Sequence, residues 1–259
     1  MSEQQSTYTR DEMMTVAAAR RLQNGAVCFV GIGLPSAACN LARLTHAPDL
    51  VLIYESGTVG TRPTVLPLSI GDGELAETAR SVIPLPEIFT HYLQRGRVDV
   101  GFLGAAQIDR HGNLNSTVIG SYAQPTVRLP GSGGAPEIAS HARTVLVIMK
   151  QSARTFVERV DFRTSVGRPG AVITDLGILA PQGEQGELVL AALYDGVTED
   201  DARAACGWSL QVAPQVARVA PPTDTELDVL RALHTRTREA HAQRVRLSLP
   251  GLSSPAPSV

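Results

Sequence analysis

The hydrophobic and polar positions of this chain fall into short apolar runs that alternate with segments of helical periodicity. Apolar runs bounded by turn residues predict strands at residues 26–30, 50–54, 98–103 and 144–149. Helices are expected at residues 10–23, 36–44, 87–94, 137–140, 200–206 and 224–244. A β-rich layer is predicted from three more strands, at residues 171–174, 178–180 and 187–192. The alternation indicates an α/β fold with an open, mainly parallel sheet and flanking helices.

The first sixty residues predict one complete strand–helix–strand unit. Thr9 is followed by Glu12 and then by apolar residues, which matches a capping box at the start of the first helix. Asn24 and Gly25 are expected to stop that helix, and Pro35 suits the first turn of the next one. The two strands that enclose the second helix are therefore expected to be parallel, with a right-handed crossover.

Proline and glycine mark the segments that we expect to be irregular. Residues 60–86 are interpreted as a long loop with short pieces of structure, and residues 120–136 as another irregular stretch. Residues 104–115 predict a strand, a tight turn and a returning strand. A tail at 247–259, with several prolines and serines, is expected to be disordered. Without a repeat or a compositional break, residues 1–246 are expected to form a single domain.

Composition and charge exclude several classes of partner. The chain has 259 residues with a formal net charge of −2, and it lacks the basic stretch that would follow a nucleic-acid backbone. Its aromatic content of 4% argues against the stacking of bases. No apolar run is long enough to span a membrane, and the first ten residues lack the apolar segment of a signal peptide. Cys28, Cys39 and Cys206 form no disulfide framework, so the expected address is the cytoplasm.

One carboxylate stands at the end of a predicted buried strand. Glu55 directly follows the apolar run 50–54 and precedes Ser56 and Gly57, which allow a sharp turn. In open parallel sheets, ligands gather at the carboxyl ends of the strands. A carboxylate in that place is either capped by nearby N–H groups or retained for chemistry. We expect chemistry, with Glu55 as a nucleophile.

Two nearby motifs suggest other chemistry but fit it poorly. Gly31-Ile32-Gly33 follows a strand as in dinucleotide-binding turns, yet a serine occupies position 36, where that fingerprint needs a third glycine. This turn is then either a plain tight turn or a set of backbone N–H groups that face an acyl or carboxylate oxygen. Ser56 lacks the two flanking glycines of a nucleophile elbow, which argues against a serine hydrolase.

A second glycine-rich stretch and three amides complete the candidate site. The stretch precedes a predicted helix and consists of Gly131, Ser132, Gly133, Gly134 and Ala135. Its backbone can approach a ligand closely and offer N–H donors, and the alternative is a flexible linker. Gln107, Asn113 and Asn115 either bind substrate oxygens or hold the hairpin corner together. The six histidines are isolated and have no metal-ligand spacing, so we expect no metal site.

These motifs occur in one order, and together they resemble the beta subunits of class I CoA-transferases. The resemblance is carried by Glu55-Ser-Gly57 and by residues 31–35 (GIGLP), 104–109 (GAAQID), 112–115 (GNLN) and 131–135 (GSGGA). It lies in the glutaconate CoA-transferase branch, and residues 24–77 are most similar to B subunits that act on 3-oxoadipate. It covers nearly the whole chain except for the last few tens of residues.

The resemblance implies an open α/β fold of the CoA-transferase (NagB/RpiA-like) type. It implies an alpha-subunit partner in a hetero-oligomer, expected to be α2β2, and coenzyme A thioester as a substrate without any further cofactor. It places the active-site glutamate at Glu55. By the same analogy the site around the thioester is lined by Gly31, Gly33, Ser56, Gly57, Gln107, Asn113, Asn115, Gly131, Ser132, Gly133 and Gly134.

The implied activity moves CoA from succinyl-CoA to 3-oxoadipate, a step of the β-ketoadipate pathway of aromatic-compound degradation, through a glutamyl-CoA thioester on Glu55. Three alternatives stay open. The acceptor can be glutaconate or another dicarboxylate, the enzyme can hydrolyse CoA thioesters, or the chain can be a non-catalytic binding subunit. One departure from the relatives is a shortened connection at residues 167–171, which leaves open how that edge packs on the partner.

Overall fold

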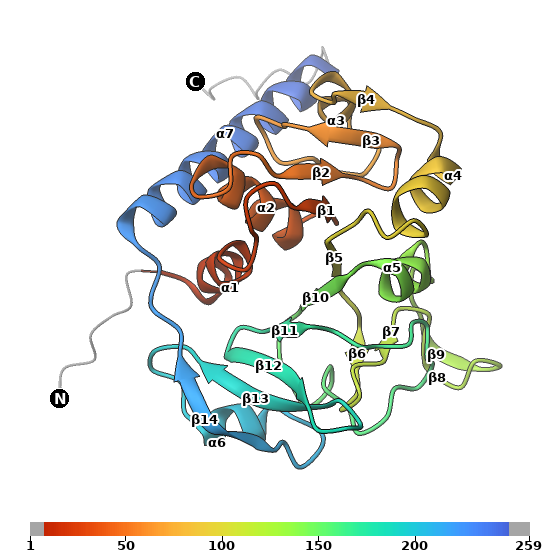
Figure 1. Ribbon diagram of the computed structural model, residues 1–259, viewed down its shortest axis with the longest axis vertical. Coiled ribbons are helices and arrows are strands. Elements are labelled where there is room, and N and C mark those ends of the chain that lie inside the picture. Colours follow the sequence, from red (N-terminus) through yellow and green to blue (C-terminus); the bar gives the residue numbers. More distant parts are fainter. Residues whose placement is uncertain (1–7, 249–259) are drawn as a thin grey trace, which may run out of the picture.

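A ten-stranded sheet runs through the length of the molecule in the computed structural model, which describes residues 8–248 (Figure 1). Its strands are β1 Val27–Phe29, β2 Val51–Ile53, β3 Thr58–Thr61, β4 Ser81–Val82, β5 Val100–Leu103, β10 Thr144–Ile148, β11 Ala171–Ile173, β12 Gly177–Gln182, β13 Glu187–Leu193 and β14 Val212–Arg218. The spatial order is β14-β13-β12-β11-β10-β5-β1-β2-β3-β4. Strands β11, β10, β5, β1 and β2 are mutually parallel, whereas β3, β4 and β12 join by antiparallel pairing.

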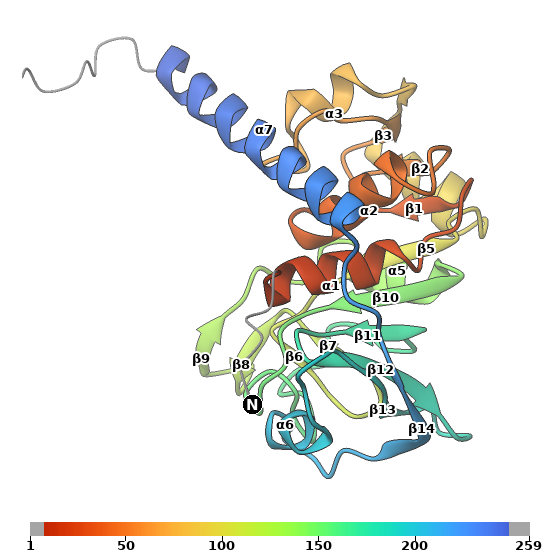
Figure 2. The ribbon, with the colours of Figure 1, turned by 90° about the vertical axis from the view of Figure 1, so that its left-hand side faces the viewer.

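Helices cover both faces of this sheet. They are α1 Arg10–Ala19, α2 Leu34–Leu44, α3 Gly73–Glu77, α4 Leu85–Glu87, the π-helix η1 Ile88–Leu93, α5 Ala135–His141, α6 Glu199–Ala204 and α7 Asp224–Ser248. Helices α1, α2 and α7 lie on one side of the parallel strands, and α4 and α5 lie on the other (Figures 1 and 2). The predicted α/β architecture with a mainly parallel sheet is confirmed.

The strand–helix–strand unit at the start of the chain forms as predicted. Thr9 Oγ1 accepts a hydrogen bond from the Glu12 N–H at 3.1 Å, and the Glu12 carboxylate accepts one from the Thr9 N–H at 2.7 Å, so the capping box is complete. Helix α1 ends at Ala19, four residues before the expected end, because residues 20–22 continue as turns. Strands β1 and β2 pair in parallel, with Val27 opposite Val51.

The core lies on both sides of the parallel strands. Leu52 and Ile53 of β2 are fully buried, as expected for a strand covered on two faces. Met13, Met14 and Val16 of α1 are also buried, because α2 and α7 pack beside α1 over the sheet. Each such side chain contributes about 1.5–3 kcal/mol by its removal from water. This packing holds the parallel strands rigidly, and their carboxyl ends carry the candidate site.

The two segments predicted to be irregular differ in how much regular structure they contain. Residues 60–86 hold only short pieces, as expected: the end of β3, helix α3 and strand β4. A hairpin of β8 Val118–Gly120 and β9 Pro125–Arg128 occupies much of 120–136, so the irregular assignment was wrong there. Strand β14 was also missed. All but one residue of β9 are exposed, so that strand lacks the apolar alternation that marks a half-buried strand.

Other local predictions are confirmed. Strands β6 Gln107–Ile108 and β7 Leu114–Asn115 form the expected hairpin, and Gly183 and Gly186 adopt positive φ angles of 70° and 64° in the turn between β12 and β13. Helix α7 continues to Ser248, so the tail expected at 247–259 begins inside that helix. Its remaining residues, 249–259, lie outside the described part of the chain.

Candidate active site

Glu55 lies in a cavity of about 320 Å³ at the carboxyl ends of the central parallel strands. The cavity is lined by residues 29–31 at the end of β1, residues 102–104 at the end of β5, and the loop 130–135. Strand β2 lies on one side of β1 and β5 lies on the other, so the strand order reverses at this position. Crevices at such a reversal are the usual ligand sites of open α/β sheets.

A tight turn presents Glu55 at the end of β2. The Gly57 N–H donates to the Tyr54 carbonyl at 3.0 Å, and the Tyr54 N–H donates to the Thr58 carbonyl at 3.1 Å. Gly57 has a φ of 102°, and a Cβ at this position would clash with the carbonyl oxygen of Ile83. The turn therefore requires glycine at position 57, and it fixes the backbone from which Glu55 projects.

A buried hydroxyl pair ties this turn to helix α2. The Tyr54 ring is fully buried, and its hydroxyl lies 2.8 Å from Ser36 Oγ. Burial raises the pKa of Tyr54 well above its ordinary value, so the phenol stays protonated. Helix α2 starts after Gly33, whose φ of 81° serves as the N-cap conformation. The strand that carries Glu55 and the turn after β1 are thus held in one rigid unit.

The Glu55 carboxylate is partly exposed and makes no hydrogen bond or ion pair with any other residue of 8–248. No N–H group of residues 8–248 therefore caps the Glu55 carboxylate, which was one of the two interpretations of this residue. The backbone of Gly134 lies against the carboxylate, because a Cβ on Gly134 would stand 3.3 Å from Glu55 Oε1 and 2.8 Å from Phe89 Cζ. A side chain at position 134 would displace one of these groups.

The glycine loop is held at its base rather than free. The Gly131 N–H donates to the Ser116 carbonyl at 2.8 Å, and the Ser116 hydroxyl donates to the Gly131 carbonyl at 2.8 Å. Gly131 and Gly133 have φ angles of 106° and 47°, which L side chains rarely adopt. The N–H groups of Gly133 and Gly134 make no hydrogen bond within residues 8–248. Both residues line the cavity, so their N–H groups are candidate donors to a ligand oxygen.

The structure brings together some of the predicted site residues and separates others. Those that line the cavity are Glu55, Gly31, Gly131, Ser132, Gly133 and Gly134. Gly33, Ser56 and Gly57 belong to the turns that carry the lining residues. Ser56 Oγ and Thr58 Oγ1 are buried without a hydrogen-bond partner in the described chain. Sequence reasoning missed the apolar lining, which includes Phe29, Ile70, Phe102 and Ile138.

The three candidate amides lie in the β6–β7 hairpin and do not line the cavity. Asn115 Nδ2 donates to Gln107 Oε1 at 2.8 Å, and Gln107 Nε2 donates to Asp161 Oδ2 at 3.2 Å. At the hairpin corner, Asn113 Nδ2 donates to both carboxylate oxygens of Asp109, at 3.0 and 3.1 Å. These contacts hold the corner together, which was one of the two interpretations. Substrate binding by the amides stays a prediction.

No group of three or more His, Cys, Asp and Glu side chains in residues 8–248 is arranged to hold a metal ion. No helix in the same range has both the length and the apolar character needed to cross a membrane. The groups available in the cavity are an unpaired carboxylate, backbone N–H donors and apolar side chains. This arrangement suits attack on a carbonyl, because the donors can stabilise the oxyanion that forms.

Sequence comparison places this geometry among known proteins. A profile of the family described as coenzyme A transferase matches residues 11–204. The chain is 58% identical over 255 residues to the B subunit of 3-oxoadipate CoA-transferase from Pseudomonas knackmussii, across 92% of this chain and 98% of that protein. It is 34% identical over 237 residues to the B subunit of glutaconate CoA-transferase from Acidaminococcus fermentans, across 83% and 89% of the two chains.

Solved structures share the fold. The crystal structure of glutaconate coenzyme A-transferase from Acidaminococcus fermentans matches with a TM-score of 0.81 at 32% identity, across 87% of this chain and 94% of that chain. The crystal structure of the decarboxylase AibA/AibB matches with a TM-score of 0.81 at 29% identity, across 90% and 98%. Because one fold serves a transferase and a decarboxylase, the reaction has to be inferred from the side chains of the site.

Proposed function

The chain belongs to the coenzyme A transferase family, among the class I beta subunits, and we propose that it moves CoA from succinyl-CoA to 3-oxoadipate through a thioester on Glu55. The observation that carries this proposal is the Glu55 carboxylate, which is unpaired within residues 8–248 and shares a cavity with the glycine loop, so close to Gly134 that a Cβ there would lie 3.3 Å from it. The choice of 3-oxoadipate is supported by 58% identity to a relative named for that substrate.

The reaction begins with attack of a Glu55 carboxylate oxygen on the thioester carbonyl of succinyl-CoA. This forms a succinyl-glutamyl anhydride and expels the CoA thiolate. The thiolate then attacks the glutamyl carbonyl, which leaves Glu55 as a CoA thioester and releases succinate. A carboxylate of 3-oxoadipate attacks that thioester and again expels the thiolate. The thiolate attacks the 3-oxoadipyl carbonyl, which regenerates Glu55 and forms 3-oxoadipyl-CoA.

The cavity supplies what each step needs. A carboxylate is a weak nucleophile in water, and exclusion of water with fixed placement raises its reactivity. Phe29 and Phe102 form apolar walls beside Glu55. The N–H groups of Gly133 and Gly134 are the proposed donors that stabilise the successive oxyanions, and removal of one such donor typically lowers the rate roughly a hundred- to a thousandfold. The proposed reaction uses the CoA thioester as a substrate and no further cofactor.

We also propose an alpha subunit as the partner that closes the cavity, in an α2β2 complex. Relatives at 58% and 34% identity are named as B subunits, and a matching solved structure is named AibA/AibB. Apolar side chains are exposed beside the site, including Ile70 at 40% and Leu68 at 65%. Exposed apolar clusters of this kind mark protein interfaces. The cytoplasm stays the predicted compartment, in keeping with three free cysteines.

The proposal is tested with the reconstituted alpha–beta complex. Glu55→Gln should lower the transfer rate by several orders of magnitude, since it removes the nucleophile. In the wild type, mass spectrometry after addition of succinyl-CoA should find CoA attached to the peptide that contains Glu55. Glu77→Gln, which changes an exposed glutamate of α3, should leave the rate unchanged. Full activity of Glu55→Gln would contradict the proposal and favour a non-catalytic role in binding.

The acceptor is tested in the same assay. Succinyl-CoA is offered with 3-oxoadipate, glutaconate or acetate, and with water alone as the measure of hydrolysis. The proposal expects the highest kcat/KM with 3-oxoadipate and little release of free CoA without an acceptor. A preference for glutaconate, or rapid hydrolysis, would retain Glu55 as the nucleophile but overturn the proposed acceptor or reaction.

A further inference from the structure

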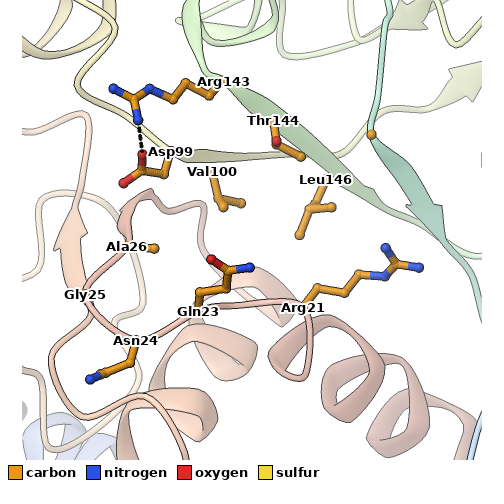
Figure 3. A pocket seen from close by; sticks show the side chains of 11 residues that line it. Arg21, Gln23, Asn24, Gly25, Ala26, Asp99, Val100, Arg143, Thr144 and Leu146 are labelled. Carbon is orange, nitrogen blue, oxygen red and sulfur yellow. Dashed lines mark hydrogen bonds and ion pairs between the residues drawn. The ribbon is translucent and has the colours of Figure 1, made fainter.

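A second cavity, of about 490 Å³, lies at the amino ends of the parallel strands (Figure 3). We call this side of the sheet the amino edge, and the side with Glu55, at the carboxyl ends of the strands, the carboxyl edge. It is lined by residues at or just before the amino ends of three strands: Ala26 before β1, Asp99 and Val100 at β5, and Thr144 at β10. Its volume lies within the range of roughly 300–1,000 Å³ that is usual for small-molecule sites. The reaction proposed for Glu55 makes no use of this cavity.

Two consecutive arginines behave differently at this edge. Arg20 is fully engaged: it bonds the Glu226 carboxylate at 2.7 and 2.8 Å and donates to two backbone carbonyls before α7. Arg21 lines the cavity, and its guanidinium makes no hydrogen bond or ion pair with another residue of 8–248. Arg21 is exposed to solvent, and partial burial of its side chain lowers its pKa. The phenol of Tyr194 lies near it and is kept protonated by its own burial. Arg21 therefore carries a positive charge that no side chain of the described chain compensates.

The single carboxylate of the cavity is already neutralised. Asp99 accepts a hydrogen bond from the Val27 N–H at 2.8 Å and another from Arg143 Nη1 at 3.0 Å. Three uncharged polar side chains also line the cavity. The Asn24 amide bonds Asp49, donating to its carboxylate and accepting from its N–H. The Gln23 amide, which points toward the middle of the cavity, and the Thr144 hydroxyl make no side-chain hydrogen bond within residues 8–248 (Figure 3). The net charge that faces the cavity is therefore positive.

Apolar side chains separate these polar groups. Val100 and Leu146 lie between Arg21 and Arg143 in Figure 3, and Ala26 borders the same space. Val100 and Leu146 are 9% and 3% exposed, so they belong to the rim of the core. An apolar floor with a few convergent polar groups is the usual composition of a ligand site. An inorganic anion bound to Arg21 would cover no apolar surface, so Val100 and Leu146 would stay in contact with water.

We propose that this cavity binds a small carboxylic acid with an apolar chain, with its carboxylate on Arg21 and its chain on Val100 and Leu146. The planar guanidinium of arginine matches the two oxygens of a carboxylate. The Gln23 amide and the Thr144 hydroxyl can bond a second polar end of the ligand. The site is separate from the Glu55 cavity, so it can respond to the concentration of an acid without competing for the reacting position.

Equilibrium dialysis of the full-length chain, alone and in complex with its alpha partner, tests this with radiolabelled adipate as the probe. The wild type should bind one adipate that is retained by Glu55→Gln. Arg21→Gln should weaken that site at least about tenfold, since a charge-assisted hydrogen bond is lost. Gln23→Trp, which fills the cavity from an exposed position, should abolish it. Arg236→Gln, an exposed arginine of α7, is the control and should bind normally.

Four outcomes would overturn all or part of the inference, the last of them in the competition with phosphate. The first is the absence of any adipate site in Glu55→Gln, and the second is a site that Arg21→Gln and Gln23→Trp leave intact. The third is a loss of alpha–beta assembly in Arg21→Gln together with no cavity-bound adipate in the wild type, which would make the cavity a socket for an acidic side chain of a partner. Inorganic phosphate as a competitor should displace adipate poorly, and displacement at equal concentration would show that the apolar floor plays no part.

Discussion

The two edges of the parallel sheet differ in how they present polar groups. At the carboxyl edge, the cavity contains a carboxylate and the backbone of glycine turns, and the loops approach each other so closely that a Cβ at Gly57 or Gly134 would collide with a neighbour. At the amino edge, the cavity contains long side chains, Arg21, Gln23 and Arg143, on short turns. One edge is built from fixed backbone and the other from long side chains with many rotamers.

Because of this difference, the cavity at the carboxyl edge suits a chemical reaction and the cavity at the amino edge suits ligand binding. Backbone N–H groups do not reorganise as charge develops, so they suit the stabilisation of a transition state. Long side chains adapt to a ligand but lose rotamer freedom when they bind it, so they suit recognition at modest affinity. The same strands therefore carry a site fit for chemistry at one end and a site fit for a passive ligand at the other.

Among the substitutions that test this comparison, Gly134→Ala is expected to have the largest effect. Gly134→Ala places a Cβ 3.3 Å from Glu55 Oε1 and 2.8 Å from Phe89 Cζ, so the carboxylate or the loop must shift. We expect kcat to fall roughly a hundredfold, as when an oxyanion donor is lost, with a smaller change in KM. Gly73→Ala in α3 is the control, since its Cβ would meet only the end of a side chain at 3.7 Å. Equal kcat values for the two variants would show that backbone placement is unimportant here.

An intermediate effect is expected at the pair that holds the Glu55 strand. Tyr54→Phe leaves the Ser36 hydroxyl without its partner at 2.8 Å in the core, and we expect a loss of about 1–2 kcal/mol in the free energy of unfolding. Urea unfolding of the wild type, Tyr54→Phe, Ser36→Ala and the double variant measures this. The two single losses should not add. Additive losses would mean that the hydroxyls do not act as a pair.

The smallest effect is expected for the ion pair between Arg20, the neighbour of Arg21 in the chain, and Glu226. Burial tends to raise the pKa of Glu226, but hydrogen bonds from Arg20 and Thr223 lower it to about 2. A carboxylate with a depressed pKa in the folded state stabilises the fold above its ordinary pKa of 4.5, and this stability is lost as the pH falls from about 4.5 to about 2.

The variant Glu226→Gln should therefore be less stable than the wild type at pH 7, by about 1 kcal/mol or less for a partly solvated pair. The gap in Tm should narrow as the pH falls through this window. A gap that stays constant from neutral pH to the lower end of the window would show that the Arg20–Glu226 pair contributes nothing through its charge, in which case Arg20 resembles Arg21 more than the structure indicates.

The parts of the fold that could be predicted are those coded by neighbours in the chain. The apolar run before Glu55 marks β2, and Thr9 with Glu12 marks the start of α1, because strand burial and helix capping depend on residues a few positions apart. Glu55 and the glycine loop were identifiable for the same reason. Strand β9 was not, because its side chains are mostly exposed and give no alternation.

The features that sequence reasoning missed depend on contacts between distant segments. Gln107 bonds Asp161, which is 54 residues away, and this contact is visible only after both loops are in place. The amino-edge cavity likewise joins the end of α1 to the starts of β5 and β10, and nothing local marks Arg21 as different from Arg20. The apolar wall of the Glu55 cavity was missed because Phe29 and Phe102 have the same appearance as ordinary strand residues.

The reciprocal bonds between Ser116 and Gly131 have a consequence for how this scaffold can vary. They join the two ends of the segment 117–130, which therefore forms a closed loop. The free-energy cost of closing a loop rises by only about 0.6 kcal/mol for each doubling of its length. Insertions or exchanges at its tip can therefore accumulate in descendants, or be grafted by engineers, while the glycines beyond Gly131 keep their register against Glu55.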